Sequence, residues 1–222
     1  MNMKKSILCF LLILLVSPIN AGFLGGAYKQ LAHNCYKTSQ GLWKCESEDW
    51  IDINVEDLCP RIKFGIAVEQ GNFPIIDFRV FDYYAKTSLG KVLNNITYDS
   101  KNKRYERNCS FSLYFSDGEI FTCSGWLVDS RKKDYRGQDA GSAWLYTNIG
   151  RMQSNKINFN EISGESLITY VTKKLSTKKL VKITFAGLNF AMDNVLTAEI
   201  FSTFFTELYK KTGDKDLYHN DD

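Results

Sequence analysis

Histidine, serine and cysteine are the side chains that most often act as catalytic bases and nucleophiles. This chain has two histidines, His33 and His219, and a Ser-His-Asp mechanism needs its histidine on a rigid element. Neither lies in a strong strand or helix pattern, and Cys35, beside His33, is expected to form a disulfide rather than to act as a thiol nucleophile. Ser-x-x-Lys can pair a nucleophile with a base, but here it occurs in polar turns and is read as turn composition. The four instances are Ser88/Lys91, Ser100/Lys103, Ser130/Lys133 and Ser176/Lys179.

Carboxylates are concentrated in one region, residues 46 to 57. The acidic residues are Glu46, Glu48, Asp49, Asp52, Glu56 and Asp57. Two converging carboxylates can hydrolyse a glycosidic bond, whereas the spacing of a calcium-binding EF-hand loop is absent. Two interpretations follow: solvated acids on an irregular segment, or the site of a carboxylate-dependent hydrolase.

Five cysteines lie beyond residue 21, and we treat all of them as disulfide candidates: Cys35, Cys45, Cys59, Cys109 and Cys123. In an oxidising compartment they predict two disulfides and one remaining thiol. Their spacing does not match a zinc site, and no phosphate-binding glycine motif occurs. The sequence therefore predicts no catalytic residue, no cofactor and no metal.

The N-terminus has the pattern of a secretory signal peptide. Lys4 and Lys5 precede ten apolar residues, 7 to 16, and Pro18 and Ala21 mark the helix end and the cleavage site. Ten residues are too few to span a bilayer, which takes about 20, although an uncleaved anchor is the alternative. We expect residues 1–21 to be removed and the protein to be secreted or periplasmic without a transmembrane anchor. Without the two lysines the charge is almost balanced, which does not favour nucleic acid as a partner.

Alternating apolar residues predict antiparallel strands in the middle of the chain. Residues 61–68 and 76–80 form one expected hairpin, and Asp117-Gly118 forms the turn of another. With a tight two-residue turn, Ser112 faces Cys123 and Cys109 faces Trp126, so the two cysteines lie on opposite faces. We therefore expect them not to pair with each other, and at least one to bond to an N-terminal cysteine.

The remaining elements are predicted from weaker patterns. They are a short helix at 87–93, a strand near 96–98, a charged loop at 129–141, a strand at 144–149, a helix at 164–176 capped by Ser163, strands at 180–186 and 195–201, and a helix at 204–211. The predicted class is α+β: a mainly antiparallel sheet, sandwich-like or curved, with two short C-terminal helices and a disulfide-linked N-terminal segment. Expected divisions are a loop-rich segment 22–60, a β-rich domain 61–211 and a disordered tail 212–222.

Aromatic residues cluster in two regions, and we expect most of them in the core. The clusters are Phe73, Phe78, Phe81, Tyr83 and Tyr84, and Phe204 with Phe205. Exposed members would provide a binding patch. We expect an exported, non-enzymatic protein that binds a protein or another envelope macromolecule in the periplasm or extracellular space. The alternative is the secreted carboxylate-dependent hydrolase.

Overall fold

The computed structural model describes residues 29–53, 61–69, 72–82, 98–99, 104–133, 139–185 and 188–217. The predicted signal peptide (1–21), the predicted helix at 87–93 and part of the acidic segment lie outside these ranges, as does Cys59.

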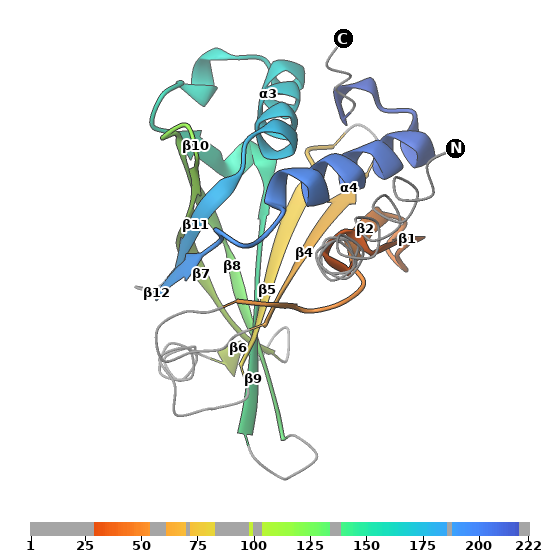
Figure 1. Ribbon diagram of the computed structural model, residues 1–222. Coiled ribbons are helices and arrows are strands. Elements are labelled where there is room, and N and C mark those ends of the chain that lie inside the picture. The colour runs from red at the N-terminus through yellow and green to blue at the C-terminus, as the bar shows by residue number, and fades with distance from the viewer. Residues whose placement is uncertain are drawn as a thin grey trace, which may run out of the picture.

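The described strands form one sheet in which all paired neighbours are antiparallel (Figure 1). The main path through the sheet is β1-β2-β4-β5-β9-β8-β7-β11-β12, and β3, β6 and β10 pair with β4, β7 and β8. The strands are β1 (His33–Lys37), β2 (Trp43–Ser47), β3 (Ile51–Asp52), β4 (Arg61–Val68), β5 (Ile75–Asp82), β6 (Tyr98–Asp99), β7 (Arg104–Phe115), β8 (Ile120–Lys133), β9 (Asp139–Asn148), β10 (Met152–Ser154), β11 (Leu180–Phe185) and β12 (Leu188–Ala191). The mainly antiparallel α+β class is confirmed.

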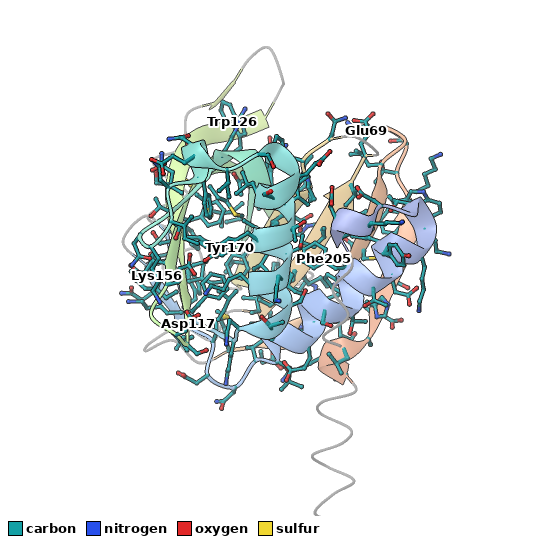
Figure 2. All side chains as sticks on the ribbon, turned by 90° about the horizontal axis from the view of Figure 1, so that it is seen from above. Glu69, Asp117, Trp126, Lys156, Tyr170 and Phe205 are labelled. Carbon is teal, nitrogen blue, oxygen red and sulfur yellow. A yellow bond between two sulfur atoms is a disulfide. The ribbon has the colours of Figure 1, made fainter. Side chains whose placement is uncertain are left out.

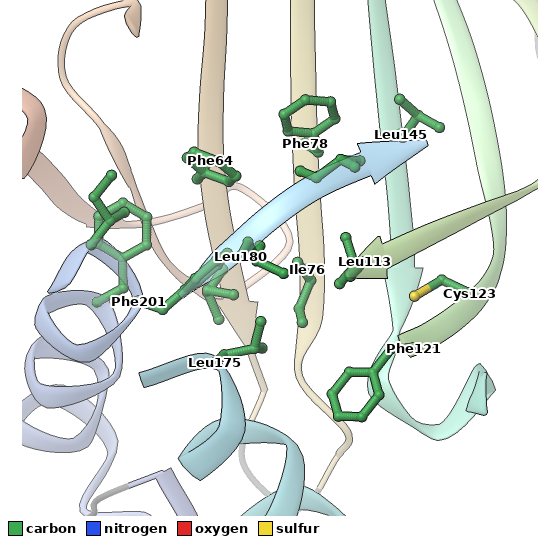
Figure 3. Packing of buried hydrophobic residues seen from close by; sticks show 14 of the residues in the cluster. Phe64, Ile76, Phe78, Leu113, Phe121, Cys123, Leu145, Leu175, Leu180 and Phe201 are labelled. Atoms are coloured by element: carbon green, nitrogen blue, oxygen red, sulfur yellow. The ribbon is translucent and has the colours of Figure 1, made fainter. Parts of the chain in front are cut away.

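Strand alternation gives the sheet one apolar face, which the helices cover. Phe64 on β4 and Phe78 on β5 are directly opposite each other on this face, and Phe201 of α4 (Thr197–Thr212) packs edge-on against Phe64 at 5.4 Å between ring centroids. Figure 3 shows Phe64, Phe78 and Phe201 in the same apolar layer. We call this the inner face of the sheet, and its opposite the outer face.

Helix α3 (Gly164–Thr177) begins as the sequence predicts, with Ser163 Oγ accepting a hydrogen bond from the Ser166 N–H. Helix α4 begins earlier than predicted. The expected strand at 195–201 is wrong, because residues 197–212 form a helix whose buried side chains recur with a helical period: Thr197, Ile200, Phe201, Phe204, Phe205 and Leu208. Gly213 ends α4 in the left-handed conformation, with φ of 71°.

The β7–β8 hairpin is confirmed, but its predicted register is wrong by one residue. Phe115 accepts a hydrogen bond from the Gly118 N–H, and its own N–H donates to Glu119, so three residues form the loop. Gly118 has φ of 80°, as the glycine of a bulged three-residue turn requires. Cys123 therefore faces Phe111, and Cys109 faces Gly125. The two cysteines share a face, contrary to prediction, and are not bonded to each other.

The N-terminal segment is also more regular than predicted. Instead of a loop-rich appendage, β1 and β2 extend the main sheet through pairing of β2 with β4. Cys35 and Cys45 are directly opposite each other on β1 and β2 and form a disulfide, so neither is bonded to β7 or β8.

Two other expected irregular segments are shorter than predicted. Within the expected loop 129–141, β8 continues to Lys133 and β9 begins at Asp139. Lys215–Leu217 forms a 3₁₀ turn in which Leu217 is buried, so residues 212–217 are packed rather than disordered.

Candidate functional site

The outer face of the sheet carries a cleft of about 600 Å³, beside the turn that joins β1 to β2. Its walls combine aromatic, charged and small side chains. The lining residues are Tyr36, Lys37, Thr38, Ser39, Gln40, Leu42, Lys44, Ala67, Ile75, Asp77, Arg79, Trp144 and Tyr146. We call this the β1–β9 cleft.

Strand register explains why these residues meet. Asp77 on β5 lies opposite Tyr146 on β9 and opposite Gly65 on β4, and Gly65 lies opposite Glu46 on β2. The next outer-face position of β5, Arg79, lies opposite Trp144. Because side chains alternate between faces, these residues all project from the outer face.

Four charged side chains form an ion-paired cluster in this face, which we call the charge quartet: Lys44, Glu46, Asp77 and Arg79. Lys44 Nζ lies 2.8 Å from Asp77 Oδ2 and 3.0 Å from Glu46 Oε2. Arg79 Nη2 lies 3.3 Å from Glu46 Oε2, and Arg79 Nε lies 3.7 Å from Asp77 Oδ1. The Lys44 and Asp77 side chains are only 7% and 4% exposed. Two cations and two anions leave the quartet formally neutral.

Trp144 is the aromatic centre of the cleft. The Arg79 guanidinium carbon lies 5.0 Å from its ring centroid and Lys44 Nζ lies 5.7 Å away, both within cation–π range. The Tyr146 ring lies beside it at 5.1 Å between centroids. At the rim, the Tyr36 hydroxyl donates to Glu46 Oε1, although 40% of this tyrosine is exposed.

Four buried polar atoms at the cleft have no hydrogen-bond partner among the described residues: Glu46 Oε2, Asp77 Oδ1, Arg79 Nε and Trp144 Nε1. The first three have ion-pair contacts without hydrogen-bond geometry. A buried polar group with no partner is rare in folded proteins and costs about 1–3 kcal/mol, and of these four atoms Trp144 Nε1 has neither a hydrogen bond nor an ion pair. Four at one place distinguish this cleft as a candidate site.

The ionisation state of the Glu46 carboxyl group is the opposite of the one a general acid needs. Burial alone would raise the pKa of Glu46, but Lys44 and Arg79 together hold that pKa below its ordinary value. A general acid needs a raised carboxyl pKa. Glu46 is therefore held as a carboxylate.

The other described acids of the 46 to 57 segment do not converge with Glu46. Asp49 lies 4.0 Å from Lys29, and Asp52 lies 3.3 Å from Arg61. Glu48 is exposed, and its backbone carbonyl accepts a hydrogen bond from Lys63. Glu56 and Asp57 lie outside the described residues. The described acids therefore give no support to a carboxylate pair built from this segment.

A second polar cluster joins the β7–β8 turn to α3. Lys174 Nζ lies 2.5 Å from both Glu119 Oε2 and Asp117 Oδ2, and the hydroxyls of Tyr170 and Ser154 donate to Glu119. Figure 2 shows Asp117 and Tyr170 on the α3 side of the sheet. Glu119 is almost completely buried, at 1% exposed, yet both its oxygens have partners. We interpret this cluster as structural, because its donors and acceptors are matched.

The described residues among the catalytic candidates considered from the sequence do not assemble into a site, while His219, Ser88/Lys91 and Ser100/Lys103 lie outside the described ranges. Cys35 is in the disulfide, and the His33 ring lies 5.9 Å from that of Phe204 in the core. Lys179 Nζ donates to the Asp193 carbonyl. Within the described ranges, no three His, Cys, Asp or Glu side chains form a group able to hold a metal.

Of the aromatic residues expected in the core, Phe78, Phe204 and Phe205 are buried and Phe73 packs against the core. Phe81 packs against Trp50 on the outer face, and Tyr83 and Tyr84 lie outside the described residues. The aromatic residues of the cleft are different ones, and sequence reasoning missed them. A signal was present: Lys44/Glu46, Asp77/Arg79 and Trp144/Tyr146 are spaced two residues apart, as side chains on one face of a strand must be.

Comparison with protein-family models, curated protein sequences and solved structures finds no match to this chain. Among the residues that the structure describes, no helix has the length and apolar character needed to cross a membrane.

Proposed function

We propose that this is an exported, non-enzymatic protein that binds another macromolecule in the periplasm or extracellular space, and that the β1–β9 cleft is its binding site. The observation that carries the proposal is the cleft itself. It combines an exposed tyrosine, two further aromatic rings and buried polar atoms that have no hydrogen-bond partner among the described residues. Aromatic residues beside arginine are typical of the energetically dominant parts of binding surfaces.

Export is supported by the N-terminal signal pattern and by the Cys35–Cys45 disulfide, since disulfides persist in oxidising compartments. This disulfide ties β1, which carries Tyr36, to β2, which carries Lys44. The wall of the cleft is therefore covalently fixed. A fixed wall lowers the ordering cost of binding.

The test is capture of a partner by the chain beginning at residue 22, with and without a blocked cleft. Ser39→Trp places an indole on an exposed residue of the cleft lining, and Ser202→Trp makes the same change on the exposed side of α4. A photo-crosslinking residue in place of Gln40, an exposed residue of the cleft lining, should form a covalent adduct in envelope or culture fluid of the producing organism. We expect Ser39→Trp to abolish the adduct and Ser202→Trp to preserve it.

Equal capture by both tryptophan variants would contradict the proposal. A chain that cleaves envelope polymers, and loses this activity in Glu46→Gln, would favour the carboxylate hydrolase instead. Secretion itself is tested by mass spectrometry of the exported chain, which should begin at residue 22.

A further inference from the structure

We propose that the β1–β9 cleft binds a neutral carbohydrate through the charge quartet and Trp144. This inference rests on the proposed function and specifies the chemistry of the ligand. It is carried by the buried atoms of the quartet and Trp144 that have no hydrogen bond, the zero net charge of the quartet, and the aromatic rings beside it.

The four buried atoms without a hydrogen bond are of two opposite kinds. Glu46 Oε2 and Asp77 Oδ1 accept hydrogen bonds, whereas the N–H groups at Arg79 Nε and Trp144 Nε1 donate them. A ligand carboxylate or phosphate would satisfy the donors but place a negative charge beside two carboxylates. A ligand ammonium would satisfy the acceptors but place a positive charge beside Lys44 and Arg79. A hydroxyl group donates and accepts at once, so a ligand rich in hydroxyls suits both kinds of atom.

Charge balance leads to the same ligand class. The quartet contains two cations and two anions within ion-pair distance, so its charges cancel. Lys37 on the cleft wall adds one positive charge at an exposed position, where solvent screens it. A buried neutral site discriminates against ions because their desolvation is not compensated.

The aromatic side chains supply the apolar part of the site. Tyr36, Trp144 and Tyr146 all line the cleft. A sugar ring presents C–H groups on one face and hydroxyls around its edge, and the negative face of an aromatic ring attracts the C–H groups. The cleft offers stacking surfaces and hydrogen-bonding groups side by side, as a sugar ring requires.

Arg79 is the member of the quartet that can shift to admit a ligand. The four atoms without a hydrogen bond are covered, while the Arg79 side chain is 32% exposed and lies over the Trp144 ring. A shift of its guanidinium on this ring that keeps its ion pairs to Glu46 and Asp77 would open a path to the indole and the carboxylates and leave the quartet neutral. Binding should therefore change the environment of the Trp144 indole N–H.

The experiment titrates the chain beginning at residue 22, with its disulfide intact, with three neutral trisaccharides: cellotriose, maltotriose and triacetylchitotriose. Binding is followed by calorimetry and by the NMR signals of the tryptophan indoles, with Trp144→Phe assigning the signal of Trp144. We expect at least one trisaccharide to bind saturably and to shift the Trp144 signal. The Trp43 signal should stay unchanged, because Trp43 lies on the opposite face of the sheet. Trigalacturonate, an acidic trisaccharide of the same length, should bind more weakly.

Two variants test the contacts. Asp77→Asn should weaken binding about tenfold or more, because it removes a charged acceptor and the balance of the quartet. Asp49→Asn makes the same change at an exposed acid outside the cleft and should bind as the parent does. Tyr36→Ala, at a 40% exposed position that does not endanger folding, should also weaken binding.

The inference is overturned if no neutral trisaccharide binds below about 10 mM, or if Asp77→Asn and Tyr36→Ala, both folded by circular dichroism, bind as the parent does. If carbohydrate fails to bind while Ser39→Trp still abolishes macromolecular capture, the ligand class is wrong and the binding site stands. If Ser39→Trp affects neither, both proposals fall.

Discussion

The carboxylate of Asp77 lies over the backbone of Gly65, its partner on the neighbouring strand, and only a residue without a side chain leaves that space open. A Cβ atom added at Gly65 would lie 2.6 Å from Asp77 Oδ1. The missing side chain lets Asp77 reach Lys44 across β4.

Gly65→Ala should therefore destabilise the protein by about 1–3 kcal/mol, because it separates a buried ion pair or strains the strand. Urea denaturation measures the loss. Gly164→Ala is the control, since the nearest atom to its Cβ would be on the edge of the Phe73 ring, at 3.2 Å, and no charged group lies within 4 Å. Gly125→Ala should be more severe than Gly65→Ala, because its Cβ would lie 2.3 Å from the Tyr146 carbonyl oxygen, and backbone yields less easily than a side chain. Equal stability of the Gly65 and Gly164 variants would contradict the prediction.

The polar cluster around Lys174 predicts acid sensitivity. A hydrogen bond from Lys174 lowers the pKa of Asp117, and hydrogen bonds from Lys174, Ser154 and Tyr170 outweigh burial and lower the pKa of Glu119. The unfolded chain binds these protons at higher pH than the folded chain does. The free energy of unfolding should therefore fall as the pH drops below the ordinary carboxyl pKa of about 4.

Glu119→Gln should reduce this pH dependence and lower stability at neutral pH, since Lys174 loses a charged partner. Denaturation curves collected between about pH 2 and pH 7 measure both effects. Glu48→Gln, at an exposed position outside this cluster and outside the helices, is the control and should behave as the parent. An unchanged acid slope in Glu119→Gln would show that Glu119 does not contribute.

The Cys35–Cys45 disulfide closes a short loop, since the two cysteines are ten positions apart in sequence. Replacing both cysteines by alanine should cost about 2–3 kcal/mol by the loop-entropy estimate. Thermal melting with and without a phosphine reductant measures this. The reductant should lower the melting temperature of the parent more than that of the double variant. An equal decrease in both would show that this disulfide does not account for the effect.

The thiol of Cys123 should resist alkylation in the native protein. Its side chain is completely buried, and burial raises the pKa of the thiol, so little reactive thiolate forms. Treatment with iodoacetamide followed by peptide mass mapping should find Cys123 unmodified without denaturant and modified in urea. Rapid modification of the native protein would contradict the buried position.

The sequence predicted elements whose signals are local. Alternation from Ile62 to Val68, the Asp117-Gly118 turn and the cap at Ser163 each depend on neighbouring residues, and each was confirmed. The predicted register of the β7–β8 hairpin was wrong because two-residue and three-residue turns share the same Asp-Gly signal. The start of α4 was predicted as a strand because its apolar residues also fit the pattern of a short strand.

The cleft could not be assembled from the sequence, because it depends on long-range pairing. Strand β5 lies beside β9, with Asp77 opposite Tyr146, and local patterns do not reveal which strands are neighbours. The polar and aromatic residues at alternate positions were visible, but not their convergence. Residues 33–52 contain more regular strand structure than the sequence predicted, because charged residues obscure the alternation of β1 and β2.

The side chain of Gln30 links the start of the described chain to the segment that precedes α4. Its amide donates to the Asn194 carbonyl, and its Oε1 accepts from the Leu196 N–H, just before α4 begins. Helix α4 also packs against β2 and β4. In a chain that crosses a membrane N-terminus first, these early strands would emerge long before the helix that covers them. Folding would then wait for the end of translocation, and a chain truncated before residue 197 would expose Phe64 and be cleared by proteases instead of persisting as a shorter folded protein.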